Sequence, residues 1–127
     1  MARNPVTTDS APAAIGPYSQ AVVSGRTLYT SGQIPIDPAT GELVEGDITA
    51  QTWRVFENLR AVCAAADTNF FHVVRVGIYL TDLADFAAVN AVMAENFSAP
   101  YPARSTIGVA ALPKGARVEI DLVLQLD

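Results

Sequence analysis

The sequence predicts a single α+β domain over residues 1–127, in which two helices pack on one face of a β-sheet in the order β-β-α-β-α-β-β. Two stretches repeat apolar residues at the three- and four-residue spacing of helices. The runs around them are rich in β-branched residues, and the last one alternates apolar and polar positions. Half of the residues are hydrophobic and 17% are charged, which excludes wholesale disorder.

The N-terminal part contains the first two expected strands. Residues 1–17 have no regular pattern, because prolines interrupt them. Strands are expected at Tyr18 to Val23 and at Thr27 to Ser31, with a hairpin turn at Ser24-Gly25-Arg26 between them. A further turn is expected at Asp37 to Gly41.

The first helix is expected from Ile48 to about Ala66, with Asp47 as its N-cap. Seven apolar residues form its stripe, namely Ile48, Val55, Phe56, Leu59, Val62, Cys63 and Ala66. Asp67-Thr68-Asn69 ends this helix. A strand follows from His72 to Leu80, and its two expected faces are Val74, Val76, Ile78 and Leu80 against Val73, Arg75, Gly77 and Tyr79.

The second helix is expected to start at a cap on Thr81 or Asp82 and to run to about Phe97. Its expected stripe is Leu83, Phe86, Asn90, Met93 and Phe97. Two more strands are expected, from Arg104 to Ala110 and from Ala116 to Leu126. The turn at Leu112 to Gly115 favours a hairpin between these two strands.

The last strand separates two kinds of side chain. Val118, Ile120, Leu122, Leu124 and Leu126 point one way, and Glu119, Asp121, Val123 and Gln125 point the other. If the helices cover the first face, the second meets water or another subunit. Its mixture of apolar and acidic residues favours a subunit interface.

Charge and residue counts exclude several classes of function. Eight basic against thirteen acidic residues leave a net charge of −5, which disfavours binding to nucleic acid or to an anionic membrane. No apolar run is long enough to span a bilayer and residues 1–20 do not resemble a signal peptide, so we expect a cytoplasmic protein. Cys63 and His72 are the single residues of their types, which disfavours a disulfide or a zinc site.

Arg104 and Asn90 are the first candidates for chemistry. Arg104 opens a strand after Pro100-Tyr101-Pro102-Ala103 and has no partner nearby in the sequence. We expect it to pair with a carboxylate, with Glu119 or Asp121 slightly favoured over one on a ligand. Asn90 interrupts an apolar stripe, so it is either a core amide with satisfied hydrogen bonds or a ligand contact at the rim of a cleft.

Two further groups of residues are candidates. Glu119 and Asp121 share a strand face about 7 Å apart, where paired carboxylates either perform acid–base chemistry or form a solvated or interfacial surface. Hydroxyl groups stand beside glycine or proline at Gly16-Pro17-Tyr18-Ser19 and at Ser31-Gly32, where free backbone N–H groups bind oxyanions or simply form turns. His72 and Cys63 are expected to be structural.

These segments resemble the Rid family of reactive-intermediate deaminases (RidA-like proteins, formerly the endoribonuclease L-PSP family) from about Ala14 to Leu126. The most specific motifs are Tyr101-Pro102-Ala103-Arg104-Ser105-Thr106, Val109 to Gly115 and Val118-Glu119-Ile120. Supporting motifs lie at Gly16 to Ala21, Leu28 to Pro35, Asp37 to Gly41, Tyr79 to Asp82 and Phe86 to Asn90.

The resemblance implies a fold similar to chorismate mutase of the AroH type, with both helices on one face of a mixed sheet. It implies a homotrimer whose open sheet faces line a central barrel, with ligand clefts between subunits. The implied activity is hydrolysis of reactive 2-enamine or 2-imine acids, such as 2-aminoacrylate or 2-iminopropionate, to 2-keto acids and ammonia without metal or cofactor. The alternatives are a non-catalytic member that binds small carboxylates, a catabolic deaminase of aminomuconate-like compounds, and the ribonuclease activity ascribed to some relatives, which the charge disfavours.

The resemblance also assigns roles to individual residues. Arg104 matches the arginine that binds the substrate carboxylate, and Glu119 matches the glutamate associated with the attacking water. Other cleft positions are matched by Tyr18, Ser31, Gly32 and Asn90. Thr106 stands where many members have a cysteine, so the resemblance leaves the subgroup and substrate preference open.

Overall fold

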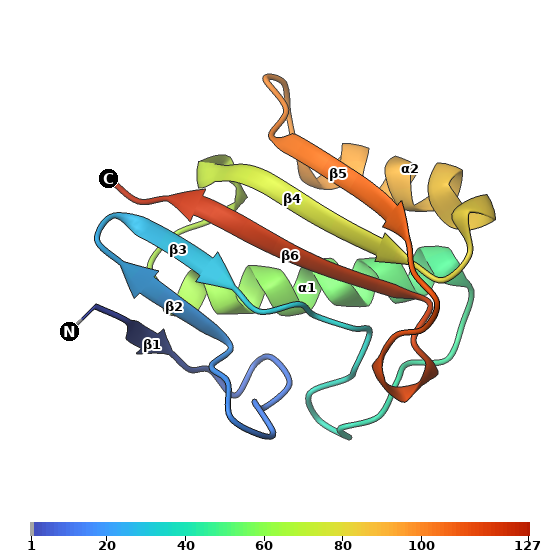
Figure 1. The fold of residues 1–127 in the computed structure, drawn as a ribbon, viewed down its shortest axis with the longest axis horizontal. Coiled ribbons are helices and arrows are strands. Elements are labelled where there is room, and N and C mark those ends of the chain that lie inside the picture. Colours follow the sequence, from blue (N-terminus) through green and yellow to red (C-terminus); the bar gives the residue numbers. More distant parts are fainter. Residues whose placement is uncertain (1) are drawn as a thin grey trace.

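The computed structural model describes residues 2–127, in which six strands form one sheet beside two α-helices (Figure 1). The strands are β1 (Asn4–Val6), β2 (Ala21–Ser24), β3 (Thr27–Thr30), β4 (Val73–Leu80), β5 (Ala103–Gly108) and β6 (Val118–Gln125). The helices are α1 (Ile48–Ala65) and α2 (Phe86–Asn96). Single 3₁₀ turns occur at Phe70–His72, Leu83–Asp85 and Pro113–Gly115.

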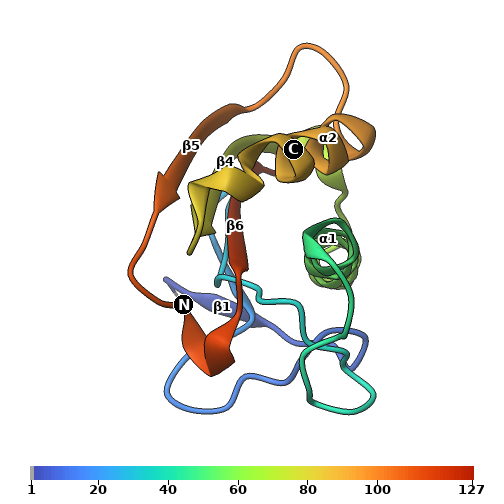
Figure 2. The ribbon, with the colours of Figure 1, turned by 90° about the vertical axis from the view of Figure 1, so that its right-hand side faces the viewer.

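The sheet is mixed and carries both helices on the same face. Its strand order is β1-β2-β3-β6-β4-β5, and β4 with β5 is the parallel pair while the other neighbours are antiparallel. The side view shows α1 and α2 together on one side of the sheet and the other side bare (Figure 2). The predicted fold class and helix arrangement are therefore confirmed.

The core lies between α1 and the central strand β6. The alternation predicted for β6 is confirmed, because Val118, Ile120, Leu122 and Leu124 are all buried while the residues between them remain partly accessible. Asp47 caps α1 as predicted, accepting a hydrogen bond from the Ala50 N–H at 2.9 Å. Asp67 follows the end of α1 with φ at +57°, the left-handed conformation that commonly ends a helix.

The prediction that residues 1–17 contain no regular structure was wrong. Asn4 to Val6 form an edge strand that pairs antiparallel with β2. Pro5 is tolerated there because an edge strand leaves one row of N–H groups without a partner strand, so the missing donor breaks no ladder. A three-residue strand is too short to produce a pattern in the sequence.

The predicted hairpin between the last two strands was also wrong. β5 and β6 lie on opposite sides of β4, and β5 pairs with β4 in parallel. The connection from β4 to β5 passes through α2, which is the usual way to join two parallel neighbours. The 3₁₀ turn at Pro113–Gly115 therefore belongs to a crossover over β4 and not to a tight hairpin.

Two smaller predictions fail for local reasons. The register of β4 shifts between Val73 and Arg75, and this irregularity buries Val73 while leaving Val74 exposed. The apolar stripe of the second helix is also out of phase, because Asp82 caps a separate 3₁₀ turn before α2 begins at Phe86. The buried residues here are Val89, Val92, Met93 and Phe97, whereas Leu83, Phe86 and Asn90 are exposed.

The bare face of the sheet carries large side chains of mixed character. Tyr29 and Ile107 are each 48% exposed, and Glu119, Asp121 and Val123 are half-buried between them along the sheet. The predicted subunit interface on this face stays a prediction. Among residues 2–127, no helix combines the length and apolar character needed to cross a membrane.

Candidate active site

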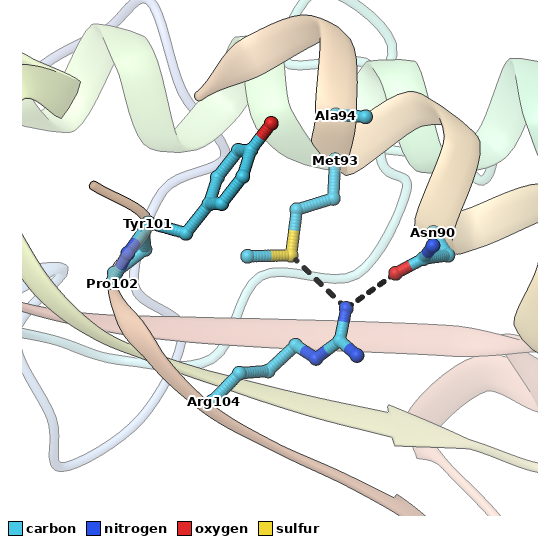
Figure 3. Close-up of a pocket in the computed structure, with 6 residues that line it drawn as sticks. All are labelled: Asn90, Met93, Ala94, Tyr101, Pro102 and Arg104. Carbon is cyan, nitrogen blue, oxygen red and sulfur yellow. Dashed lines mark hydrogen bonds between the residues drawn. The ribbon is translucent and has the colours of Figure 1, made fainter. Parts of the chain in front are cut away.

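The Arg104 side chain projects from β5 toward α2, where uncharged side chains surround its guanidinium group (Figure 3). Its Nη1 donates to Asn90 Oδ1 at 2.5 Å and lies 3.6 Å from Met93 Sδ. The guanidinium carbon lies 5.3 Å from the centroid of the Phe86 ring, within the range of a cation–π contact. The β4-α2-β5 crossover produces this arrangement, since it lays α2 alongside β5 on the helix-covered face of the sheet.

Side chains of this region line an open cavity of about 470 Å³. Its lining consists of Asn90, Met93, Ala94, Tyr101, Pro102 and Arg104. None of the lining side chains is acidic, and Arg104 forms no ion pair within the described part of the chain. The predicted salt bridge from Arg104 to Glu119 or Asp121 was therefore wrong, and the positive charge at the cavity remains available to an anion.

Asn90 is not the core amide that its place in the sequence suggested. It is exposed, and its Oδ1 orients Arg104. The prediction placed Asn90 in the buried stripe because it counted helical turns from Leu83, whereas α2 begins at Phe86. Of the two interpretations of Asn90, the core amide is excluded by this position.

Thr106 lies two residues beyond Arg104 on the same strand. On β4, Ile78 is the register partner of Thr106, and Val76 is the register partner of Arg104. Both partners are core residues, so Thr106 and Arg104 are on the helix-covered face of the sheet. The Thr106 Oγ1 atom is buried, and no hydrogen-bond partner exists for it among residues 2–127. An unpaired buried hydroxyl is unfavourable by roughly 1–3 kcal/mol, a cost that a hydrogen bond to a water molecule or another polar group would offset.

Glu119 stands on the other face of the sheet, beside a glycine. It is the cross-strand partner of Tyr79 and lies between the core residues Val118 and Ile120. A Cβ atom placed on Gly32 would come within 2.7 Å of the Glu119 carboxyl group, so only glycine allows this approach. Burial and, to a smaller extent, the negative charge of Asp121 raise the pKa of Glu119 above its ordinary value.

Backbone pairing holds the segment from Ser31 to Gln33 next to Glu119. Gln33 N donates to Ile120 O at 2.8 Å, and Ile120 N donates to Gln33 O at 3.1 Å. Ser31 is tied to the segment just before β2, because its Oγ donates to Ser19 O at 2.6 Å and its N–H donates to Gln20 O at 2.9 Å. Ser31 and Gly32 therefore stand with Glu119 as one group.

Tyr18 lies beyond this group, in a hollow formed by the N-terminal segment. Its side chain is 53% exposed, and its Oη accepts a hydrogen bond from Ile15 N at 3.4 Å. The segment is held by Gln20, which sequence analysis missed. Gln20 is buried and bonds to Thr8, Ala11 and Pro12. A glutamine between a serine and an alanine carries no signal of burial, so the sequence offered no way to identify it.

The candidate residues thus form two groups on opposite faces of one chain. Arg104, Asn90 and Thr106 belong to the helix-covered face, whereas Glu119 and Gly32 belong to the bare face. The chain by itself does not bring Arg104 and Glu119 together.

His72 and Cys63 belong to neither group. His72 Nδ1 lies 3.9 Å from Asp127 Oδ2. Burial raises the pKa of Cys63 to about 12, which keeps the thiol protonated. Residues 2–127 contain no cluster of three or more acidic, His or Cys side chains suited to a metal ion.

The fold and the two groups define an α+β protein with two helices over a six-stranded mixed sheet, as in solved RidA structures. Residues 8–125 match the family model described as Endoribonuclease L-PSP, so the chain belongs to this family, which is the Rid family of the resemblance. A crystal structure of RidA from an Antarctic Psychrobacter species is 52% identical, with a TM-score of 0.93 over 98% of this chain and 100% of that one.

Two relatives illustrate the names that accompany this similarity. Protein DfrA of Myxococcus xanthus is 56% identical over 125 residues, which cover 97% of this chain and 95% of the relative. A protein of Dermatophagoides farinae named 2-iminobutanoate/2-iminopropanoate deaminase is 47% identical over 122 residues, which cover 96% of this chain and 95% of the relative. The chain is thus similar over nearly its whole length to proteins named as imine deaminases.

Proposed function

We propose that this protein hydrolyses reactive 2-enamine and 2-imine acids, of the 2-aminoacrylate and 2-iminopropionate type, to 2-keto acids and ammonia. The observation that carries the proposal is the Arg104 guanidinium, oriented by a neutral amide over a cavity without a carboxylate. A guanidinium offers paired N–H donors that match a carboxylate in geometry and charge. The relatives named as 2-iminobutanoate/2-iminopropanoate deaminases support the choice of substrate.

In the proposed reaction, Arg104 binds the carboxylate of the protonated imine and so fixes the position of the C=N carbon. Glu119 accepts a proton from a water molecule as the water oxygen bonds to that carbon, which gives a carbinolamine. Glu119 then returns this proton to the nitrogen, the C–N bond breaks as ammonia leaves, and the carbinol hydroxyl releases its proton to solvent as its oxygen becomes the ketone oxygen. No oxidation occurs and no metal or cofactor is required, so orientation and electrostatics supply the rate enhancement.

The position of Thr106 suits a role in substrate binding. Its buried hydroxyl has no partner within the described chain and lies on the strand face that carries Arg104. A water molecule or a polar atom of the substrate would satisfy this hydroxyl. The hydroxyl takes the place of the cysteine thiol common in the family, and in this mechanism no thiol nucleophile is required.

A homotrimer accounts for the separation of the two groups of residues. Arg104 and Glu119 face opposite sides of the sheet, so a site that uses both is completed when a second subunit lays its bare face beside the cavity of the first. The partly apolar bare face, with Tyr29 and Ile107 half exposed, suits burial between copies. In this arrangement, each cleft contains the Arg104 group of one subunit and the Glu119 group of its neighbour.

The test is to measure how fast the protein removes 2-iminopropionate generated by an amino acid oxidase and trapped with semicarbazide. We expect the protein to lower the yield of semicarbazone. Arg104→Ala should abolish this effect while leaving the oligomer intact, and Arg26→Ala, which removes an arginine from the hairpin turn between β2 and β3, should not. Full activity of Arg104→Ala would contradict the role of Arg104. Binding of 2-keto acids without turnover of any imine would favour a non-catalytic carboxylate-binding protein.

Ribonuclease activity is the second candidate, because the matching family model carries the description endoribonuclease. The net charge of −5 argues against it, since a protein that binds RNA through phosphates needs a basic surface. The same preparation should therefore leave RNA intact at low ionic strength. Cleavage of RNA that disappears as salt increases and survives Arg104→Ala would favour the ribonuclease.

A further inference from the structure

Glu119 has two polar neighbours on the bare face of the sheet that the proposed reaction does not use. Tyr79 on β4 is its cross-strand register partner, and Asp121 follows it by two residues on β6. Tyr79 Oη donates a hydrogen bond to Asp121 Oδ2 at 3.1 Å. The side chains of Glu119, Tyr79 and Asp121 therefore form one cluster across the two central strands.

A glycine on β4 provides the space for this cluster. Gly77 is the register partner of Asp121, and a Cβ atom placed on it would overlap Asp121 Oδ1 and stand 3.0 Å from Tyr79 Oη. The Asp121 carboxylate therefore lies over the bare backbone of Gly77 and is bonded to Tyr79. On the far side of Glu119, a Cβ atom placed on Gly32 would come within 2.7 Å of the Glu119 carboxyl group. Two glycines, one on each side, leave the space that the two carboxylates occupy.

We propose that Tyr79 and Asp121 are a positioning pair for Glu119, in which Tyr79 fixes the Asp121 carboxylate so that its charge makes Glu119 a stronger base. The inference rests on the proposed function, because it concerns the group that takes the proton from water. A second carboxylate held about 7 Å away on the same strand face disfavours ionisation of the first. The pKa of Glu119 is then raised toward neutral pH, where a general base is most effective.

The charged groups around Glu119 agree with this assignment. Burial is the largest cause that raises the pKa of Glu119, and the charge of Asp121 is the second. From β4, Tyr79 faces the carboxylates with a pKa raised by burial and by Asp121, while Arg75 acts on Tyr79 in the opposite direction. Ser31, Gly32 and Gln33, which pack against Glu119, carry no titratable group, and Tyr29 faces Val123 further along the sheet. Asp121 is thus the acidic neighbour that tunes Glu119.

The test is the isosteric change Asp121→Asn, which removes the charge and keeps an acceptor for the Tyr79 hydroxyl. We expect the acidic limb of the kcat/KM profile for 2-iminopropionate to move about half to one pH unit lower, as loss of a like charge at this distance predicts. Glu57→Gln is the matched control, because it removes one negative charge from an exposed position on α1. Its profile should coincide with that of the original protein.

A second measurement does not depend on catalysis. The Glu119 carboxyl can be titrated by NMR with ¹³C-labelled glutamate, assigned through Glu119→Gln. Asp121→Asn should lower the midpoint pH of this titration by the same amount as it moves the acidic limb. A Glu119 titration and an acidic limb that both stay unchanged would overturn the positioning role. An NMR shift in a protein that hydrolyses no imine would support the coupling between the carboxylates while overturning the proposed function.

Discussion

Arg104 and Asn90 form a pair in which a cation is oriented without being neutralised. The Nη1 of Arg104 donates to the amide oxygen of Asn90 at 2.5 Å, and the other contacts of the guanidinium are the Met93 sulfur and the Phe86 ring. A carboxylate at position 90 would orient the guanidinium equally well but would satisfy its charge. The neutral amide leaves that charge for a ligand, and this difference can be tested by replacing the amide nitrogen with oxygen.

We expect Asn90→Asp to raise KM for anionic imines by about tenfold or more, since charge-assisted hydrogen bonds contribute roughly 1.5–3 kcal/mol and 1.4 kcal/mol is tenfold. Asn96→Asp is a close control, because Asn96 is on the same helix and its Oδ1 accepts from Arg60 Nη2 at 2.8 Å, away from the cavity lining. Steady-state kinetics of both variants decide the matter. An equal rise in KM for both would mean that added negative charge on α2 is the cause.

Thr106→Val should separate stability from activity. The change removes a buried hydroxyl that has no partner within residues 2–127 and keeps the shape of the side chain. We expect the free energy of unfolding to rise by about 1 kcal/mol, within the usual range for such a group, and kcat/KM to fall. Thr52→Val is the opposite case, because the buried Thr52 hydroxyl donates to Ile48 O at 2.7 Å, so this variant should lose stability. Denaturant unfolding and kinetics of both variants measure these effects; unchanged kinetics in Thr106→Val would remove this hydroxyl from the site.

Gly32→Ala should displace Glu119. The added methyl group would lie 2.7 Å from the carboxyl, and the adjoining backbone cannot retreat because Gln33 is paired with Ile120. We expect a loss of kcat with little change in KM, because Arg104 is untouched. Gly108→Ala on β5 is the control, since its methyl group would meet only the Leu83 side chain at 3.2 Å. If kcat falls as much in the control as in Gly32→Ala, the effect is a general response of the sheet.

Elements with a strong, uninterrupted period were predictable from the sequence. β6 alternates without a break and α1 keeps its stripe for five turns behind an Asp47 cap, so both appear as predicted. β1 was missed because three residues with a proline make no pattern. The phase of α2 was missed because a 3₁₀ turn advances the chain by a different angle per residue than an α-helix, and the two join at Phe86 without a break in hydrophobicity.

The candidate residues could be chosen from the sequence by their type, but their arrangement could not be predicted. Arg104 and Glu119 were identified because a charge among apolar residues requires a partner. Their separation was not foreseen, because the sequence contains no sign that β5 joins the sheet beside β4 and not beside β6. With the predicted hairpin the two residues would have lain on adjacent strands; with the parallel crossover β4 separates those strands, and the two side chains face opposite sides of the sheet. A turn motif such as Leu112 to Gly115 is compatible with both connections.

Glu119 should destabilise the folded protein at neutral pH. Its pKa is raised in the folded state, so between the unfolded and folded pKa values the folded chain binds more protons than the unfolded one. The free energy of unfolding therefore falls as pH increases through this window, beginning near the ordinary glutamate value of about 4.3.

Glu119→Gln removes the titrating group, so the stability of this variant relative to the original protein should be greater at pH 7 than at pH 4. Urea unfolding at both pH values measures this difference, with Glu95→Gln on the exposed side of α2 as the control. A stability difference that stays constant between the two pH values would mean that the Glu119 pKa is not raised by folding. A difference confined to pH 7, in a variant that is also inactive, would indicate that the burial that makes Glu119 useful as a base is the same burial that lowers the stability of the fold.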